Sequence, residues 1–142
     1  MYLTAIIDVY SRYIVGWTLS NTLDSSVCTG LLKRCVAQHG RPEIINSDQG
    51  SQFTSEGWID SCVNAGIKIS MDGKGRAIDN IYIERFWRTI KQELIYLNEY
   101  RDGLGLYQAI DLWMKFYNSD RIHSSIKSTP ELIYSQSQQQ IA

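Results

Sequence analysis

Asp48 is the residue whose type and position most directly suggest chemistry. It follows the apolar run 44–45 and precedes the small polar stretch QGSQFTS at 49–55. A carboxylate at the C-terminal end of a buried strand faces the crevice in which α/β sheets bind ligands. The alternative is an Asx-type turn, in which the Asp48 side chain accepts a hydrogen bond from the amide of Gly50 or Ser51. On this stretch alone the turn is the better interpretation, because Asp is a common turn former.

A second carboxylate, Glu84, lies in the first two turns of a predicted helix, and thirty-five residues lie between it and Asp48. Taken alone, Glu84 is typical of a solvated helix position that pairs with Arg88 four residues later, an interaction worth about 0.2–0.5 kcal/mol. Neither acid by itself separates a catalytic role from a structural one.

The three cysteines form no close metal-type pair, and an odd number argues against a disulfide framework. Cys28 and Cys35 are seven residues apart in a segment with helical periodicity, so they share one face. We therefore expect Cys28, Cys35 and Cys62 to be reduced core residues.

Composition limits the class of protein. The 142 residues fit one domain, and 44% hydrophobic with 20% charged residues is typical of a soluble globular chain. No apolar stretch approaches the roughly 18 residues of a membrane span, and no leader-like segment opens the chain, so the default expectation is a cytoplasmic protein without a membrane partner. A net charge of −1 excludes a general basic coat, so any polyanion binding must be local.

The elements that must position the two acids follow a mixed α/β order. Apolar runs at 1–9 and 13–19 around the turn 10–12 predict a hairpin. Asp24 supplies N-cap chemistry for a helix from about 26 to 39, and Gly40 ends it. A short buried strand at 44–45 and a helix at 55–65, which Gly66 ends, follow. The apolar face of that second helix is predicted to consist of Trp58, Ile59, Cys62 and Val63.

Alternation at 67–71 predicts the last strand, and the two glycines and two cations of 72–77 predict a surface loop. Asp79-Asn80 then caps a long helix that runs to about Leu97. Its apolar stripe is predicted to be Ile83, Phe86, Trp87, Ile90, Leu94 and Leu97. A final helix is expected at about 104–118, and the Ser- and Gln-rich stretch 135–140 is expected to fray.

Four phrases in this order resemble the catalytic core of insertion-sequence transposases that share the retroviral-type integrase domain, within the ribonuclease-H-like superfamily of acidic-triad polynucleotidyl transferases. They are YLTAIIDVYSRYIVGW at 2–17, SDQGSQFTS at 47–55, GRAIDNIYIERFWRTIKQE at 75–93 and YNSDRIHSSIKSTP at 117–130. The resemblance implies an α/β fold with a ribonuclease-H-like mixed sheet flanked by helices over residues 1–134, followed by a polar tail at 135–142. It places the family's second and third catalytic acids on Asp48 and Glu84.

That family carries out metal-dependent DNA cleavage and strand transfer by in-line displacement at a phosphodiester. The resemblance therefore implies that Asp48 and Glu84 are catalytic and hold Mg²⁺ or Mn²⁺ in a site of two ions about 3.5–4 Å apart. Such hard ions take oxygen ligands, so neither His39 nor His123 is required as a ligand. The implied partners are DNA, both element ends and target, and further copies of the chain in a homo-oligomer.

One departure from the family concerns its first catalytic aspartate, which lies upstream of the stretch that begins here at Tyr2. Asp8 matches a position near the end of the second strand instead, and we expect it to pair locally with Arg12. The strand that carries the missing aspartate is central in the resembling fold. We therefore expect that Met1 marks a truncated frame or an internal start, and that the chain alone is marginally stable and inactive.

Cations surround the position of Glu84. Arg85, Arg88 and Lys91 share the exposed side of its helix, and Lys74 and Arg76 precede it. Together with Asn80 they are candidates for contacts to DNA phosphates, which position a duplex without reading its bases. The alternative is a solvated helix face, as charge runs usually are.

Two aromatic residues and the closing phrase allow further alternatives. Phe86 and Trp87 are expected in the core because they lie on the apolar stripe, and not as stacking platforms for bases. The polar groups of 117–124 could brace the core or approach DNA, and bracing is favoured because side-chain hydrogen bonds mostly go to nearby backbone. His123 is not expected to act as a general base.

Three hypotheses for function follow. The first is a transposase catalytic core whose parent is a bacterial, cytoplasmic enzyme that is nucleoid-associated when bound to DNA. The second is a noncatalytic remnant that binds DNA ends or inhibits intact transposase. The third is a ribonuclease-H-like nuclease without strand transfer, against which the closing phrase 117–130 argues.

Overall fold

The structure, a computed structural model, describes residues 1–48, 50–71 and 81–141. The predicted loop at 72–77 and the predicted cap Asp79-Asn80 lie outside these ranges, and so do the candidate DNA contacts Lys74 and Arg76. The chain divides into two compact units. The first comprises Met1–Ile6 and Val15–Ile83, and the second comprises Ile7–Ile14 and Glu84–Ala142.

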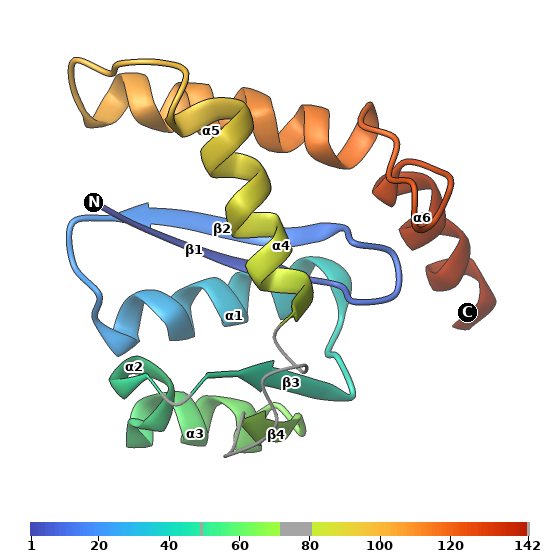
Figure 1. Cartoon of the computed structure of the whole chain (residues 1–142). Coiled ribbons are helices and arrows are strands. Elements are labelled where there is room, and N and C mark those ends of the chain that lie inside the picture. The colour runs from blue at the N-terminus through green and yellow to red at the C-terminus, as the bar shows by residue number, and fades with distance from the viewer. Residues whose placement is uncertain (49, 72–80, 142) are drawn as a thin grey trace. The chain divides into compact units, whose positions relative to one another are not determined.

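The predicted hairpin is confirmed. Strands β1 (Tyr2–Ile7) and β2 (Ile14–Ser20) pair in a two-stranded sheet (Figure 1). The connection 8–13 is too short for a parallel crossover, so the strands run antiparallel. The backbone N–H of Asp8 donates to the carbonyl of Tyr13 at 2.8 Å and closes the hairpin.

Helix α1 (Ser25–His39) begins and ends as predicted. The Asp24 carboxylate accepts a hydrogen bond from the Ser26 N–H at 3.2 Å, and Gly40 follows the helix at φ 83°, a conformation that favours glycine. The helix packs closely on β2, because a Cβ atom at Gly16 would collide with Sγ of Cys35. Gly16 thus allows this close approach of helix and strand.

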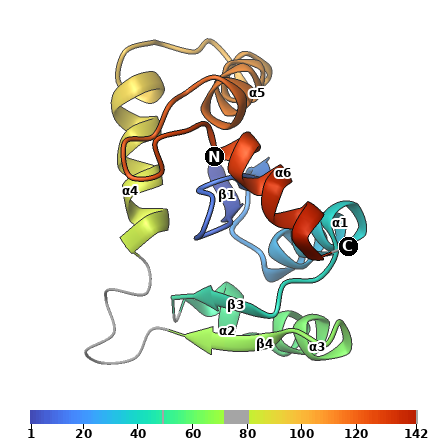
Figure 2. The same ribbon diagram turned by 90° about the vertical axis from the view of Figure 1, so that its right-hand side faces the viewer.

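A second sheet contains β3 (Ile44–Ser47) and β4 (Lys68–Met71). The two strands run parallel (Figure 2). Asn46 lies opposite Ser70, and Nδ2 of Asn46 donates to Oγ of Ser70 at 3.1 Å. Helices α2 (Ser51–Thr54) and α3 (Glu56–Asn64) connect the strands. Antiparallel and parallel pairing therefore both occur among the described strands. The prediction of a short buried strand at 44–45 is wrong at Ile44, which is 56% exposed.

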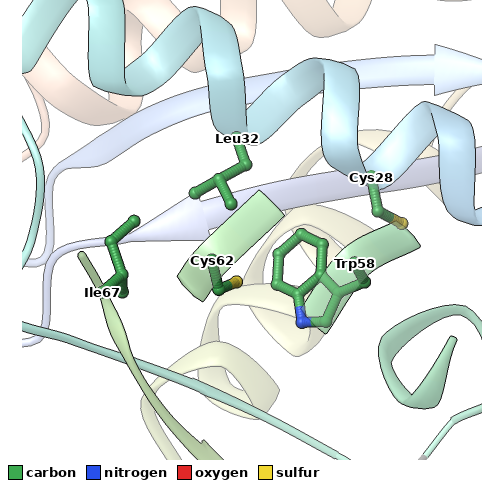
Figure 3. Close-up of a cluster of buried hydrophobic side chains, with 5 residues drawn as sticks. All are labelled: Cys28, Leu32, Trp58, Cys62 and Ile67. Carbon is green, nitrogen blue, oxygen red and sulfur yellow. The ribbon is translucent and has the colours of Figure 1, made fainter. Parts of the chain in front are cut away.

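The core of the first unit lies between α1 and α3. Cys28 and Leu32 of α1 point toward Trp58 and Cys62 of α3, with Ile67 beside them (Figure 3). All three cysteines of the chain are free and buried, as predicted. Burial in this apolar surrounding raises the pKa of the Cys62 thiol, which keeps it protonated and unreactive.

Helix α3 confirms its predicted ends but not its whole predicted face. Oγ of Ser55 accepts from the Trp58 N–H at 3.3 Å, and Gly66 adopts φ 75° after the helix. Trp58 and Cys62 are buried. Val63 is 63% exposed, so its assignment to the apolar face is wrong. It lies five residues after Trp58, whereas residues three or four positions apart share a helix face.

In the second unit, the long helix predicted to reach Leu97 is shorter and changes type. Helix α4 (Ile81–Ile90) continues as a π-helical turn η2 (Lys91–Ile95), in which the Tyr96 N–H donates to the Lys91 carbonyl at 2.9 Å. Phe86 and Ile90 are buried, as the predicted stripe requires. Leu97 is 72% exposed because it lies beyond the helical turns that would have placed it on that stripe.

Helices α5 (Gly103–Ser119) and α6 (Pro130–Ile141) complete the second unit (Figure 1). Asp102 caps α5 by accepting the Gly105 N–H at 2.8 Å. The expected fraying of 135–140 is wrong, because α6 continues through these residues and Tyr134 stacks on Tyr13 with ring centroids 4.4 Å apart. No helix within the described ranges is long and apolar enough to cross a membrane.

Candidate metal and nucleic-acid site

Asp48 lies directly after β3 with its side chain exposed. Its Oδ1 accepts a hydrogen bond from the Gly50 N–H at 2.8 Å, so the Asx-type turn considered for this residue is present. The Ser47 hydroxyl donates to the Asp48 carbonyl at 3.1 Å. Within the described residues Oδ2 receives no hydrogen bond. The turn therefore orients the Asp48 carboxylate.

A short helix that the sequence did not predict anchors this turn to the core. The Gly50 carbonyl accepts the Phe53 N–H at 2.9 Å, which begins α2. The Phe53 ring then packs edge-on against Trp58, with centroids 5.1 Å apart and an interplanar angle of 69°. The turn that carries Asp48 is therefore connected to a fully buried side chain of the first unit.

Glu84 lies in the first turn of α4 and is exposed. The positive end of the helix dipole favours a carboxylate here. The described part of α4 shows no ion pair between Glu84 and Arg88, so the local pairing considered for these residues is not supported. Phe86, two residues on, fixes the helix because its ring packs against Tyr117 of α5 at a centroid distance of 5.1 Å.

The cations of this helix lie where the sequence predicts them. Arg85, Arg88 and Lys91 are all exposed. Arg88 and Lys91 lie four and seven residues after Glu84. Glu84, Arg88 and Lys91 therefore share one face of the helix. Phe86 is 1% exposed, which confirms its assignment to the core. Trp87 is only partly buried, with its ring 5.1 Å from that of Phe86, so its assignment to the core is not confirmed.

The two acids belong to different units, Asp48 to the first and Glu84 to the second. Each is placed by the anchors of its own unit. In residues 1–48, 50–71 and 81–141, no three His, Cys, Asp or Glu side chains gather as a metal cluster.

Asp8 has a local structural role, as expected, but its carboxylate is bonded to Ser11, which the sequence did not predict. Its Oδ2 accepts both the N–H and the hydroxyl of Ser11, at 3.0 and 2.5 Å, and Ser11 is fully buried. The predicted partner, Arg12, bonds Asp8 through its backbone N–H at 2.7 Å and donates its guanidinium to the carbonyl of Val9. Asp8 thus stabilises the hairpin turn, with Ser11 as its side-chain partner.

The closing segment braces the second unit, as favoured from the sequence. The Asn118 amide accepts from the Ile14 N–H at 2.8 Å and donates to the Ile14 carbonyl at 3.1 Å. Arg121 donates to both oxygens of Glu93, with Nη2 at 2.8 Å from Oε2. Sequence reasoning missed the Glu93 to Arg121 pair, because no local spacing connects residues 28 apart.

His123 is buried in the same brace. Its ring packs edge-on against Tyr117 at 4.6 Å between centroids, and within the described residues its Nε2 has no hydrogen-bond partner. Burial lowers the pKa of His123 most, and the positive charges of Arg121 and Arg12 lower it further, while a hydrogen bond with the Tyr117 backbone and the charge of Glu93 oppose this shift. The folded chain therefore favours the neutral form of the His123 imidazole.

We expect the stability of the chain to fall on acidification through His123. Because the pKa of this imidazole is lower in the folded chain than its ordinary value of 6.5, the unfolded chain binds the proton more tightly. Stability is then fully present above about pH 6.5 and is lost as the pH falls toward the folded pKa. Thermal melts between about pH 8 and 5 should show this loss. His123→Phe should flatten that part of the profile, and an unchanged profile would contradict the assignment.

Comparison with known proteins defines the class. A family model described as integrase core domain matches residues 1–77, and a second model with the same description matches residues 65–130. The chain therefore belongs to the integrase core domain family.

Among curated relatives, the transposase for insertion sequence element IS904 of Lactococcus lactis is 36% identical over 129 residues, which cover 89% of this chain and 51% of that protein. The transposase of insertion sequence element IS629 from Shigella sonnei is 27% identical over 131 residues, 92% of this chain and 44% of that protein. The chain spans about half the length of the curated relatives it matches.

Solved structures confirm the fold. The HTLV-2 integrase catalytic core domain in complex with magnesium superposes with a TM-score of 0.75 at 22% identity, covering 93% of this chain and 83% of that one. The catalytic core of BIV integrase gives 0.79 at 17% identity over 97% of this chain and 88% of its own. These likenesses establish the ribonuclease-H-like α/β fold that the sequence predicts.

Proposed function

We propose that this chain is the catalytic core of an insertion-sequence transposase that cleaves DNA and transfers its strands with a divalent cation. The observation that carries the proposal is that the two integrase core matches cover the chain from residue 1 to 130, with Asp48 inside the first and Glu84 inside the second. The exposed position of both carboxylates supports it, since an acid that must reach a DNA phosphate cannot be covered by the core.

Asp48 and Glu84 fit a site for Mg²⁺ or Mn²⁺. Each carboxylate has an oxygen that accepts no hydrogen bond from the described residues. Hard cations of this kind prefer oxygen ligands and retain several waters. An aspartate from the segment that precedes this stretch in the family completes the set for two ions. When bound, the cations would neutralise the negative charge on the phosphoryl oxygens.

The residues of the chain itself align the reactants. Through the cations that they would hold, Asp48 and Glu84 would place the scissile phosphate opposite the attacking oxygen, first of water and then of the freed 3′-hydroxyl. In the second reaction the 3′-oxygen bonds to a target phosphorus, the proton of the hydroxyl leaves to solvent, and the target strand's own 3′-oxygen departs. One phosphodiester is exchanged for another, so the reaction needs no external energy source.

Cations beside Glu84 hold the DNA. Arg85, Arg88 and Lys91 line the exposed face of α4 and η2 and bind backbone phosphates, and Lys74, Arg76 and Asn80 do the same before that helix. Such contacts supply affinity and position without reading bases. The net charge of −1 confines this binding to the neighbourhood of the acids.

The partners follow from the reaction. Joining two element ends to one target requires at least two catalytic cores, so we assign the assembled enzyme as a homo-oligomer on DNA, in the bacterial cytoplasm and at the nucleoid. A solved neighbour of similar fold, from simian T-cell lymphotropic virus, is an intasome. The second candidate is a noncatalytic DNA-binding or inhibitory form.

A strand-transfer assay tests the function. The transposase read from the genomic frame that contains residues 1–142 is incubated with labelled element ends and a target plasmid. Joined products are expected with Mg²⁺ or Mn²⁺ and none with EDTA. Cleaved but unjoined ends would favour a nuclease. DNA binding without cleavage would favour the noncatalytic form.

A further inference from the structure

We propose that Gly50 is a positioning residue for Asp48, and that the absence of a side chain at Gly50 holds this carboxylate ready for metal binding. The inference rests on the proposed function, because it concerns the task of Asp48 in that reaction. It starts from the 2.8 Å hydrogen bond between the Gly50 N–H and Oδ1 of Asp48.

The need for glycine here is not conformational. Gly50 has φ −60° and ψ 151°, which any residue adopts. The need comes from space, because a Cβ atom at Gly50 would lie 2.9 Å from Oδ1 of Asp48 and 2.9 Å from Oε1 of Gln52. Gln52 is a flexible side chain that can turn away. The Asp48 carboxylate can avoid the Cβ only by giving up the orientation that its hydrogen bond fixes.

Gly50 is also held through its carbonyl group, which lies in the next peptide unit. This carbonyl accepts the Phe53 N–H at 2.9 Å, and the Phe53 ring packs on buried Trp58 at 5.1 Å. The residue that supplies the donor to Asp48 is therefore attached to the core through α2. Residues that orient a metal ligand through a hydrogen bond matter for function: their mutation typically lowers metal affinity or activity by about 10–100-fold.

Gly50→Ala tests the inference, and Gly57→Ala is its matched control because a Cβ at Gly57 meets no atom within 4 Å. In the transposase read from the genomic frame, Gly50→Ala should raise the Mn²⁺ concentration needed for half-maximal strand transfer by about 10-fold or more, and Gly57→Ala should not. Thermal unfolding should show that both variants fold, with Gly57→Ala more stable by up to about 1 kcal/mol because Ala favours a helical position over Gly. The double variant Gly50→Ala with Gln52→Ala should keep the defect, since the remaining collision is with Asp48.

A second measurement does not depend on the folding of Gly50→Ala. In residues 1–142, amide hydrogen exchange at Gly50 should be protected in the wild type and in Asp48→Asn, which retains the acceptor oxygen. In Asp48→Ala the protection should fall by about 10-fold, the effect expected when one hydrogen bond of about 1–1.5 kcal/mol is lost. Unprotected Gly50 in the wild type would overturn the inference.

The outcomes separate this inference from the proposed function. If Asp48→Asn abolishes strand transfer while Gly50→Ala behaves like Gly57→Ala, the function stands and the role of Gly50 is refuted. If Asp48→Asn leaves strand transfer unchanged, the function fails and the role of Gly50 fails with it. A defect in Gly50→Ala that disappears in the double variant with Gln52→Ala would assign the effect to Gln52 and also refute the role.

Discussion

Asp48→Asn and Glu84→Gln should each reduce strand transfer by at least about 100-fold, because replacing residues that merely orient metal ligands already costs about 10–100-fold. Both substitutions keep the shape of the side chain and remove its charge. Asp48→Asn also retains the oxygen that accepts the Gly50 N–H, so the turn after β3 should survive. The loss should appear in the rate of the chemical step measured with preassembled DNA complexes.

Two exposed carboxylates serve as controls for these variants. Asp60 lies on the exposed side of α3, and Glu99 lies after the π-helical turn. Asp60→Asn and Glu99→Gln change the net charge by the same amount and should leave strand transfer within about twofold of the wild type, as surface substitutions usually do. Full activity in Asp48→Asn or Glu84→Gln would refute the assigned roles.

Phe86→Ala should destabilise the chain by about 3–5 kcal/mol, the usual cost of removing a buried aromatic ring from a core. Phe86 is 1% exposed, and its ring contacts Trp87, Trp113 and Tyr117 at centroid distances of 5.1, 5.9 and 5.1 Å. Because domains are stable by only about 5–15 kcal/mol, the variant should be partly or fully unfolded in water. Trp fluorescence during urea unfolding measures the effect.

Leu97→Ala is the matched comparison for Phe86→Ala. Both residues belong to the apolar stripe predicted from the sequence, but Leu97 is 72% exposed. Its replacement should change stability by no more than about 0.5 kcal/mol. Equal unfolding midpoints for wild type and Phe86→Ala would show that Phe86 does not anchor the helix that carries Glu84.

Local signals explain why much of the fold is predictable from the sequence. Asp24 and Ser55 accept the backbone donors at the starts of α1 and α3, and Gly40 and Gly66 adopt positive φ after these helices. Each of these signals acts within a few residues, so sequence alone reveals it. The same holds for the Asx turn at Asp48, which depends on a residue two positions away.

Features that depend on distant residues could not be predicted. The π-helical turn at Lys91–Ile95 has no local signature, and it ends the stripe before Leu97. Helix α6 includes a Ser- and Gln-rich stretch whose composition predicted fraying. The start of this helix is held because Tyr134 stacks on Tyr13, more than a hundred residues earlier in the chain. The anchoring of Asp48 through Phe53 and Trp58 is likewise visible only in three dimensions.

Paramagnetic broadening by Mn²⁺ tests the central claim, the convergence of Asp48 and Glu84, most directly. NMR spectra of the core, extended by its preceding segment, would be recorded as substoichiometric Mn²⁺ is added. We expect the amides next to both acids to broaden at the same Mn²⁺ concentration, while those near exposed Asp60 stay sharp. Broadening around one acid alone, or around neither, would contradict a shared cation site.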